Sequence, residues 1–249
     1  MKIKGLIFDF GFTLFEFKDA TVEKYINSYK QGLNESVAKL KEYNLLKDNE
    51  IQNLFIKTFK KERSACFKNS RKTKIECPTS SLFQTVVEKL RLGKSDDEMY
   101  IKLADVYHSY EEKEWIPLKN TRKTLEILSK NKKVKMAVLS NHPHHRTIEK
   151  LLIKYDLIHY FDTIVTSAEF GKRKPDPEIF FYTLKKMGLT LPQFCLICGD
   201  EYADIVGGHR AGLKTILYNR KIKFPIEKEI NIRDLIKIDD ITEILDFID

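Results

Sequence analysis

Short apolar segments that alternate with helical patterns constrain the fold of this chain more than any other feature. They occupy residues 3–8, 134–139, 163–166, 194–198 and 214–218. Segments of this length that are apolar on both faces are typical of parallel strands covered by helices on both sides. Amphipathic patterns over residues 146–155, 177–187 and 203–211 supply helices between them, and the last pattern ends at Gly212. We therefore expect an α/β fold with a doubly wound parallel sheet.

A helical region separates the first apolar segment from the second. Apolar residues recur there at intervals of three and four, as in Leu33 and Val37, and no segment resembles a strand. The pattern predicts four or five helices. Because this region follows the first strand, we expect it to be inserted into the sheet domain. The expected domains are a sheet domain formed by residues 1–15 and 116–249 and a helical domain over residues 16–115.

The net charge of +8 comes almost entirely from one stretch of the chain. Residues 57–74 hold eight basic residues and one acidic residue, so the remainder is close to neutral. No aromatic stacking motif or helix-turn-helix pattern accompanies the stretch, which disfavours nucleic-acid binding. We expect a solvated helix end and loop here. If the stretch faces a binding cleft, it would steer an anionic substrate toward it.

Hydropathy and cysteine content indicate a cytoplasmic protein that does not enter a membrane. No apolar run approaches the roughly 18 residues that a membrane helix needs, and Asp9 interrupts the apolar N-terminal stretch, which disfavours a signal peptide.

Four cysteines in 249 residues are too few for a disulfide scaffold, and reduced thiols are expected. Cys195 and Cys198 have the spacing of a zinc or redox motif, but in a strand they would lie on opposite faces, so we expect core residues.

Polar residues of few kinds follow the predicted strands. Asp9 follows the first, Ser140 and Asn141 follow the second, Lys174 precedes a Pro-Asp-Pro sequence after the third, and Asp200 and Asp204 follow the fourth. In open parallel sheets ligands bind at the carboxyl ends of the strands, so we expect these side chains to converge.

This set of side chains suits phosphoryl transfer. Asp9 and Asp200 offer the oxygen ligands that Mg²⁺ prefers. Ser140 and Asn141 can hold phosphate oxygens, and the ammonium group of Lys174 can neutralise their charge. Because no Ser/His/Asp or Cys/His pattern is present, the expected nucleophile is the carboxylate of Asp9, which would form an aspartyl phosphate.

In their order and sequence context, these motifs resemble those of the haloacid dehalogenase-like superfamily, and the resemblance extends over the whole chain. In that family a strand leads to Asp-x-Asp-x-Thr, a Ser or Thr ends the second strand, a Lys precedes Pro-Asp-Pro, and Gly-Asp with a later Asp ends the fourth. The resemblance implies a Rossmann-like core with an inserted helical cap that closes over the site and selects the substrate. It also implies a magnesium-dependent phosphohydrolase that acts on a small phosphorylated molecule.

The resemblance assigns a role to each matching residue. Asp9, Ser140 and Lys174 would be catalytic, and Ser140, Asn141 and Lys174 would bind phosphate. The metal ligands would be Asp9, the backbone carbonyl of Gly11, Asp200 and Asp204. Alternatively, Asp204 would orient Lys174 or a metal-bound water and would not bind the metal itself.

One position departs from the family pattern. The second aspartate of the first motif, which in family phosphatases donates a proton to the leaving group and then activates water, is Gly11 here. General acid and base catalysis typically contributes about 10² to 10⁴ in rate. A replacement donor could come from His142, His144, His145 or Glu201, although polar residues at a strand end that face solvent are the simpler interpretation.

The departure leaves several functions open. One is a phosphatase for substrates with good leaving groups, such as acyl or aryl phosphates, or one with a borrowed proton donor. Another is a protein that keeps the fold and binds a phosphorylated ligand or partner without useful turnover. Family dehalogenases and phosphonate hydrolases also lack this aspartate. The acidic pair Asp200 and Asp204 disfavours the dehalogenase, and the many lysines single out none as the imine-forming residue of a phosphonate hydrolase.

Overall fold

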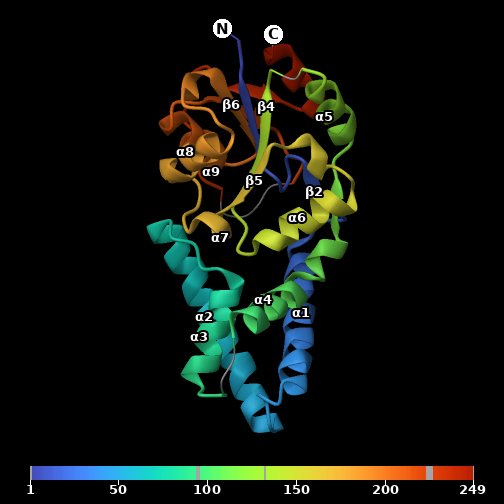
Figure 1. Ribbon diagram of the computed structural model, residues 1–249, viewed down its shortest axis with the longest axis vertical. Coiled ribbons are helices and arrows are strands. Elements are labelled where there is room, and N and C mark those ends of the chain that lie inside the picture. The colour runs from blue at the N-terminus through green and yellow to red at the C-terminus, as the bar shows by residue number, and fades with distance from the viewer. Residues whose placement is uncertain (1, 94–95, 132, 223–226, 249) are drawn as a thin grey trace.

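The computed structural model describes residues 2–93, 96–131, 133–222 and 227–248. Within these residues, six strands form one sheet in which all neighbouring strands are parallel (Figure 1). In sheet order they are β5 (Thr163–Thr166), β4 (Lys135–Ser140), β1 (Gly5–Phe8), β6 (Cys195–Gly199), β7 (Lys214–Tyr218) and β8 (Ile236–Ile238). The five predicted strands are confirmed, and β8 is an additional edge strand.

Helices cover both faces of the sheet because the strand residues alternate between two apolar clusters. Leu6 and Phe8 of β1 face one cluster, which includes side chains of α5 (Thr121–Ser129), α6 (His145–Lys154) and the C-terminal 3₁₀ segment Ile241–Phe247. Ile7 faces the other cluster, which includes α8 (Pro177–Lys186). The helix α9 (Tyr202–Arg210) packs beside α8. The predicted doubly wound fold is therefore confirmed.

The cysteine predictions are confirmed for one pair and wrong for the other. Cys195 and Cys198 are buried, and they belong to the clusters on opposite faces of the sheet. Cys66 and Cys77 form a disulfide with Cα atoms 5.9 Å apart, so the expectation of reduced thiols does not hold for them. Cys66 lies in a helix and Cys77 in the loop that follows, and this proximity is not visible in the spacing alone.

The inserted region is a helical unit with its own apolar core. It contains α1 (Val22–Glu42), α2 (Asn49–Thr73), α3 (Thr79–Lys89) and α4 (Asp97–His108), which are at the bottom of Figure 1. Their buried apolar residues form a cluster that is separate from both clusters of the sheet. We refer to this unit as the cap, and we keep its division from the core at residues 15/16 and 115/116 as a proposal.

Two features of the inserted region differ from prediction. A short antiparallel pair, β2 (Phe15–Phe17) and β3 (Trp115–Pro117), joins the cap to the core, where no strand is predicted. The basic stretch over residues 57–74 is helical through Thr73, so the expectation of a loop is wrong there. The Asp48 side chain caps the start of α2 by accepting from the Ile51 amide at 2.8 Å, and Lys74 ends it in the left-handed conformation.

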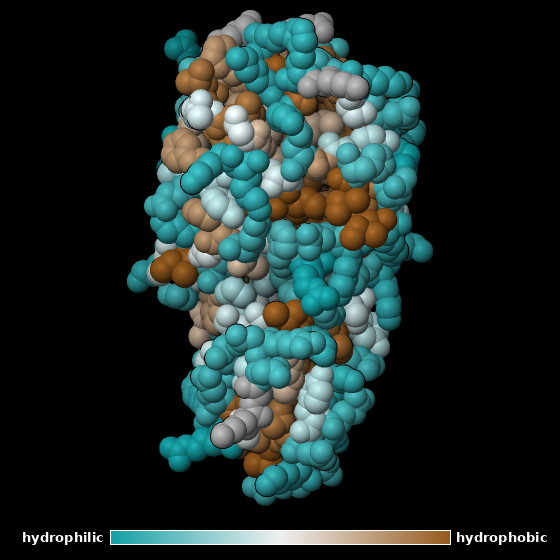
Figure 2. All heavy atoms as spheres, viewed as in Figure 1, coloured by the Kyte–Doolittle hydropathy of each residue, from teal (hydrophilic) through white to brown (hydrophobic). Residues whose placement is uncertain are grey.

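The surface agrees with the polar composition. The face shown in Figure 2 is largely hydrophilic, with apolar side chains gathered in a few patches. In the described part of the chain, no helix has the length and apolar character that crossing a membrane requires.

Candidate active site

Three carboxylates meet at the carboxyl edge of the sheet. Asp9 directly follows β1, Asp200 directly follows β6, and Asp204 lies in the first turn of α9. One oxygen of each lies within 4.8 Å of the others, and all three residues are buried. Gly199 makes this approach possible, because a Cβ atom there would lie 2.3 Å from the Cβ of Asp204. The residues predicted to hold the metal and act as nucleophile therefore lie together.

Lys174 connects two of these carboxylates. Its Nζ donates to Oδ1 of Asp9 and Oδ1 of Asp204, both at 2.5 Å, and to the carbonyl of Leu139 at 2.7 Å. Burial opposes the charged form, but the charges of Asp204 and Asp9 raise the pKa of Lys174 well above its ordinary value. Lys174 is thus a permanent cation fixed beside the predicted nucleophile.

The carboxylates carry more negative charge than their neighbours neutralise. Burial raises the pKa of Asp9, Asp200 and Asp204 above the usual range, and at Asp200 the charges of the other two raise it further. Among the described residues, three acids pair with two cations, Lys174 and Arg220. A buried set of oxygen donors with uncompensated negative charge fits a hard divalent cation such as Mg²⁺.

Asp200 has two partners that hold its orientation. The buried hydroxyl of Thr13, part of the first motif, donates to its Oδ1 at 3.2 Å, and Arg220 Nη1 donates to its Oδ2. Arg220 also donates to Glu227 at 2.6 Å. The sequence interpretation missed Arg220. Its position two residues after the end of β7, on the same edge of the sheet, was the available signal.

Ser140 and Asn141 lie at the end of β4, as predicted, but Asn141 has a structural task as well. Its Nδ2 donates to the carbonyl of Lys174 at 3.0 Å, and its Oδ1 accepts from the amide of Lys174 at 2.8 Å. The Asn141 side chain therefore positions Lys174. Ser140 is nearly buried and pairs in register with Thr166 of β5. A phosphate-binding role for the pair stays a prediction.

Gly11 lies against an aromatic wall. A Cβ atom at Gly11 would be 3.1 Å from the ring of Trp115, which is closer than ordinary contact. Trp115 is held by edge-to-face contacts with Phe10, Phe12 and Phe17, whose ring centroids are 5.8, 5.4 and 5.3 Å from its own. Trp115 therefore occupies part of the space that a side chain at position 11 would need.

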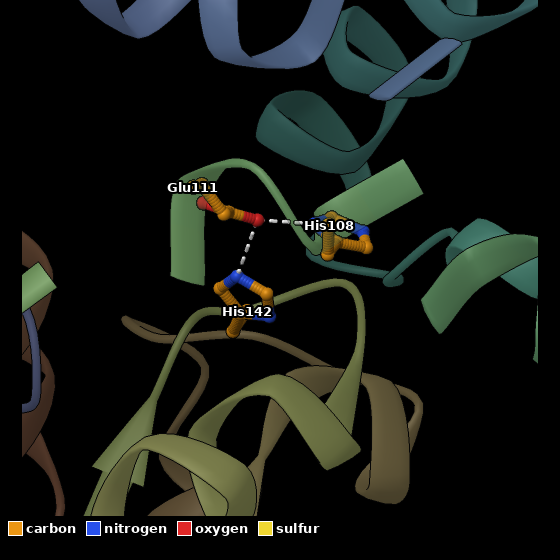
Figure 3. A group of neighbouring side chains, drawn as sticks. All are labelled: His108, Glu111 and His142. Atoms are coloured by element: carbon orange, nitrogen blue, oxygen red, sulfur yellow. Dashed lines mark hydrogen bonds and ion pairs between the residues drawn. The ribbon is translucent and has the colours of Figure 1, made fainter. Parts of the chain in front are cut away.

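Two of the three candidate histidines contact the cap. Glu111 lies at the centre of a cluster in which its Oε1 contacts His108 Nδ1 and lies 3.3 Å from His142 Nε2 (Figure 3). Its Oε2 accepts from the Tyr29 hydroxyl at 3.0 Å, and the Thr79 hydroxyl lies 2.7 Å from His108 Nε2. Burial opposes ionisation, but the two histidines lower the pKa of Glu111 well below its usual value. Hydrogen bonds thus satisfy Glu111 and His108, whereas Nε2 of His142 is buried and has no hydrogen-bond partner among the described residues.

His144 and His145 are also engaged. Nε2 of His144 lies 2.9 Å from Asp105 of α4, and Nδ1 of His145 lies 3.0 Å from the Thr166 hydroxyl. Among the described residues, neither they nor His142 line the cleft that opens onto Asp200, whereas Glu201 does. Glu201 is therefore the remaining candidate for a borrowed proton donor.

The cleft beside the carboxylates has a volume of about 650 Å³ and lies between cap and core. The core contributes Asn141, Lys174, Asp200 and Glu201, and the C-terminal end of α2 contributes Phe67 and Arg71. The end of the basic stretch thus faces the site, which fulfils the condition under which it would steer an anionic substrate.

Comparison with known proteins agrees with this geometry. The profile of the haloacid dehalogenase-like hydrolases matches residues 6–218. The chain belongs to this family. The predicted membership and the predicted hydrolase fold are therefore confirmed.

Individual relatives cover the chain to different extents. A glyceraldehyde 3-phosphate phosphatase of Methanothermobacter thermautotrophicus is 36% identical over 51% of this chain, and the match spans only 57% of that protein's length. One of Methanocaldococcus jannaschii is 28% identical over 86% of this chain and 84% of its own. The solved 2-haloacid dehalogenase of Pseudomonas syringae shares the fold, with a TM-score of 0.65 at 22% identity over 98% of this chain and 97% of that one.

Proposed function

We propose that this protein is a magnesium-dependent phosphohydrolase for a small phosphorylated substrate. The observation that carries the proposal is the buried contact of Lys174 with Asp9 and Asp204, beside Asp200, at the carboxyl edge of a parallel sheet. The names of the relatives favour a phosphatase over a dehalogenase, because both aligned relatives above are phosphatases of a sugar phosphate.

In the first half of the reaction, Asp9 supplies the nucleophile. A carboxylate oxygen of Asp9 attacks the phosphorus, the bond from phosphorus to the ester oxygen breaks, and the leaving group departs with the bonding electrons. Lys174 neutralises charge on the phosphoryl oxygens, which Ser140 and backbone amides also bind. Mg²⁺ held by Asp9, Asp200, Asp204 and the Gly11 carbonyl would supply further charge neutralisation.

In the second half, water attacks the phosphorus of the aspartyl phosphate, the bond from phosphorus to the Asp9 oxygen breaks, and inorganic phosphate that carries the water proton leaves the restored Asp9 carboxylate. Position 11 offers no acid or base in either half. Leaving groups that depart without protonation, such as aryl oxides and carboxylates, are therefore the expected preference. Glu201, at the cleft, is the candidate for partial replacement of the missing group.

The test is the release of phosphate from acetyl phosphate and p-nitrophenyl phosphate, with Mg²⁺ or with chelator. Wild type should turn over both only with Mg²⁺, and Asp9→Asn should abolish turnover because the amide is not a nucleophile. Asp234→Asn, at an exposed carboxylate that is not among the described residues lining the cleft, is the matched control and should retain activity. Turnover that survives Asp9→Asn would overturn the mechanism.

A second candidate is a binding protein without useful turnover. It is favoured by Gly11 and by the contact of Arg220 with the predicted metal ligand Asp200. Magnesium-dependent binding of a phosphorylated compound, measured by calorimetry, with no phosphate release from either substrate would select this candidate over the enzyme.

A further inference from the structure

Cations from three segments line the cleft in addition to Lys174. Arg71 and Lys74 come from the end of α2, Arg173 from the loop before Lys174, and Lys228 from the segment after β7. The mechanism proposed above uses none of them. A group of like charges in one cleft is unfavourable unless something negative binds there.

Nearby acids neutralise this group only in part, since Glu76 pairs with Arg173 and the carboxylates of Glu201 and Glu227 line the same cleft. In the part of the chain that the structure describes, no carboxylate forms an ion pair with Arg71, Lys74 or Lys228, and Arg173 has Glu76 at 3.6 Å. Partial burial and the charges of Lys228, Arg173 and Arg71 lower the pKa of Lys74. The positive charges therefore repel one another, and a bound anion would relieve this repulsion.

The backbone fixes Lys74 close to the reaction centre. The carbonyl of Lys74 accepts from the amide of Arg173 at 2.9 Å, and the amide of Glu76 donates to the carbonyl of Gly171 at 2.8 Å. Ile75 and Lys172 form an antiparallel bridge between these contacts. The backbone of Lys74 is thus held across from Arg173, which directly precedes Lys174, and the Lys74 Nζ donates to the carbonyl of Arg71.

An apolar surface accompanies the charges. Phe67 lines the cleft with 56% of its surface exposed, and the Arg71 guanidinium lies 5.6 Å from its ring centroid. A large exposed aromatic side chain next to a cation suits a ligand with a short carbon skeleton and a terminal anionic group.

We propose that Arg71, Lys74 and Arg173 form a second anion subsite, so that the substrate carries a second negatively charged group besides the phosphate that is transferred. This inference rests on the proposed phosphohydrolase. The second group is a carboxylate or a second phosphate, since both accept hydrogen bonds from guanidinium and ammonium groups.

Two matched pairs of esters test the subsite. 3-Phosphoglycerate differs from glycerol 3-phosphate by a carboxylate, and fructose 1,6-bisphosphate differs from fructose 6-phosphate by a phosphate. Wild type should favour the member with two anionic groups in at least one pair by about 10-fold or more in kcat/KM, because a charge-assisted hydrogen bond contributes about 1.5–3 kcal/mol. The pair that shows the preference identifies the group.

The variants Arg71→Gln and Lys74→Gln should reduce this ratio of kcat/KM values toward one, mainly through a higher KM for the ester with two anionic groups. Lys72→Gln is the matched control, since Lys72 is an exposed neighbour that is not among the described residues lining the cleft. Equal kcat/KM within both pairs for wild type, or a preference that persists in the Arg71→Gln, Lys74→Gln double variant, would overturn the subsite.

Failure of the proposed function gives a different result. If wild type hydrolyses none of the four esters, the same pairs are compared by calorimetric binding with Mg²⁺, and the phosphohydrolase itself is wrong only if p-nitrophenyl phosphate and acetyl phosphate are not hydrolysed either. Tighter binding of the ester with two anionic groups than of its partner in the pair, lost in Arg71→Gln, would then support the subsite. Equal binding within both pairs would reject it.

Discussion

At the scale of single residues, Gly11 has the largest chemical consequence. The resemblance places the proton donor of the family phosphatases at this position, and the ring of Trp115 lies beside it. Phe12, the next residue, has a φ of 60°, an unusual conformation for a bulky side chain that holds this turn in place. The turn is therefore shaped around Trp115 and has no acidic side chain at position 11.

The variant Gly11→Asp should accelerate hydrolysis of alkyl phosphates more than that of aryl or acyl phosphates, because alkoxide leaving groups need the proton. The upper limit of the gain is about 10² to 10⁴, and crowding against Trp115 should keep it below that limit. The ratio of kcat for glycerol 3-phosphate to kcat for p-nitrophenyl phosphate measures the effect.

Gly11→Asn is the matched control, since it has the same size and hydrogen-bonding reach but cannot donate or accept the catalytic proton. It should share the loss of thermal stability that contact with Trp115 causes and show none of the gain in the ratio. Equal acceleration of both ester classes by Gly11→Asp, or a gain that Gly11→Asn reproduces, would show that the missing acid is not what limits the rate.

At the scale of elements, the contact of α4 with the loop after β4 holds the cap on the core. His108 at the end of α4 and Glu111 just after it meet His142 of the loop (Figure 3). Removing one partner of a buried hydrogen bond of this kind leaves the other group unsatisfied, which typically destabilises a protein by about 1–3 kcal/mol. The cap position therefore depends on groups that titrate.

Stability should fall in mild acid because His108 is buried in its neutral form. Burial lowers the pKa of His108 from 6.5 to about 4, although Glu111 opposes this. Its contribution is complete above pH 6.5 and is lost as the pH falls toward 4, since the unfolded chain takes up the proton first. Between pH 7 and 5 this amounts to about 2 kcal/mol.

Urea unfolding of wild type and His108→Asn at pH 7 and 5 measures this contribution. The variant should be less stable at pH 7 and should lose less stability on acidification. Because Glu111 raises the pKa of His142 against the effect of burial, the comparison within one position is needed to isolate His108. His159→Asn, at a half-exposed histidine, should keep the wild-type pH dependence. The same dependence in His108→Asn would contradict the assignment.

Elements whose pattern repeats over their full length could be predicted, and those defined by partners far along the chain could not. The apolar segments of the sheet are buried on both faces, so their residues alone indicated parallel strands. The three-residue strands β2 and β3 are defined by their pairing with each other, as between Phe15 and Pro117, and the whole cap separates them in the sequence. The helix α2 is rich in exposed lysines, so its helical end lacked the apolar periodicity that predicts one.

At the scale of the whole molecule, the order of strand ends located the site, because parallel strands bring Asp9, Ser140 and Asp200 to one edge. The position of the cap on the core could not be predicted from the sequence. It depends on contacts such as the bridge from Ile75 to Lys172, which joins residues without a shared motif. The cations of α2 were counted from the sequence, but only the fold shows that they reach the cleft.

The whole molecule should respond to Mg²⁺ in its thermal stability, independently of turnover. Ionised carboxyls whose pKa is raised by burial destabilise the fold, and a bound cation relieves this cost. At 100 times the dissociation constant, binding to the folded state adds about 2.7 kcal/mol, which corresponds to a rise in Tm of about 5–10 °C for a chain of this size.

Relative to wild type, the variant Asp200→Asn should have a higher Tm with chelator and a lower Tm with Mg²⁺. With chelator at pH 7 it should melt above wild type, because it removes one of three buried acids whose ionised form is unfavourable. With Mg²⁺ it should melt below wild type, because it has lost a ligand. Asp234→Asn, at an exposed carboxylate, should follow wild type in both conditions. A Mg²⁺-induced shift of equal size in wild type and Asp200→Asn would place the cation elsewhere, and no shift in wild type would remove the metal from the mechanism.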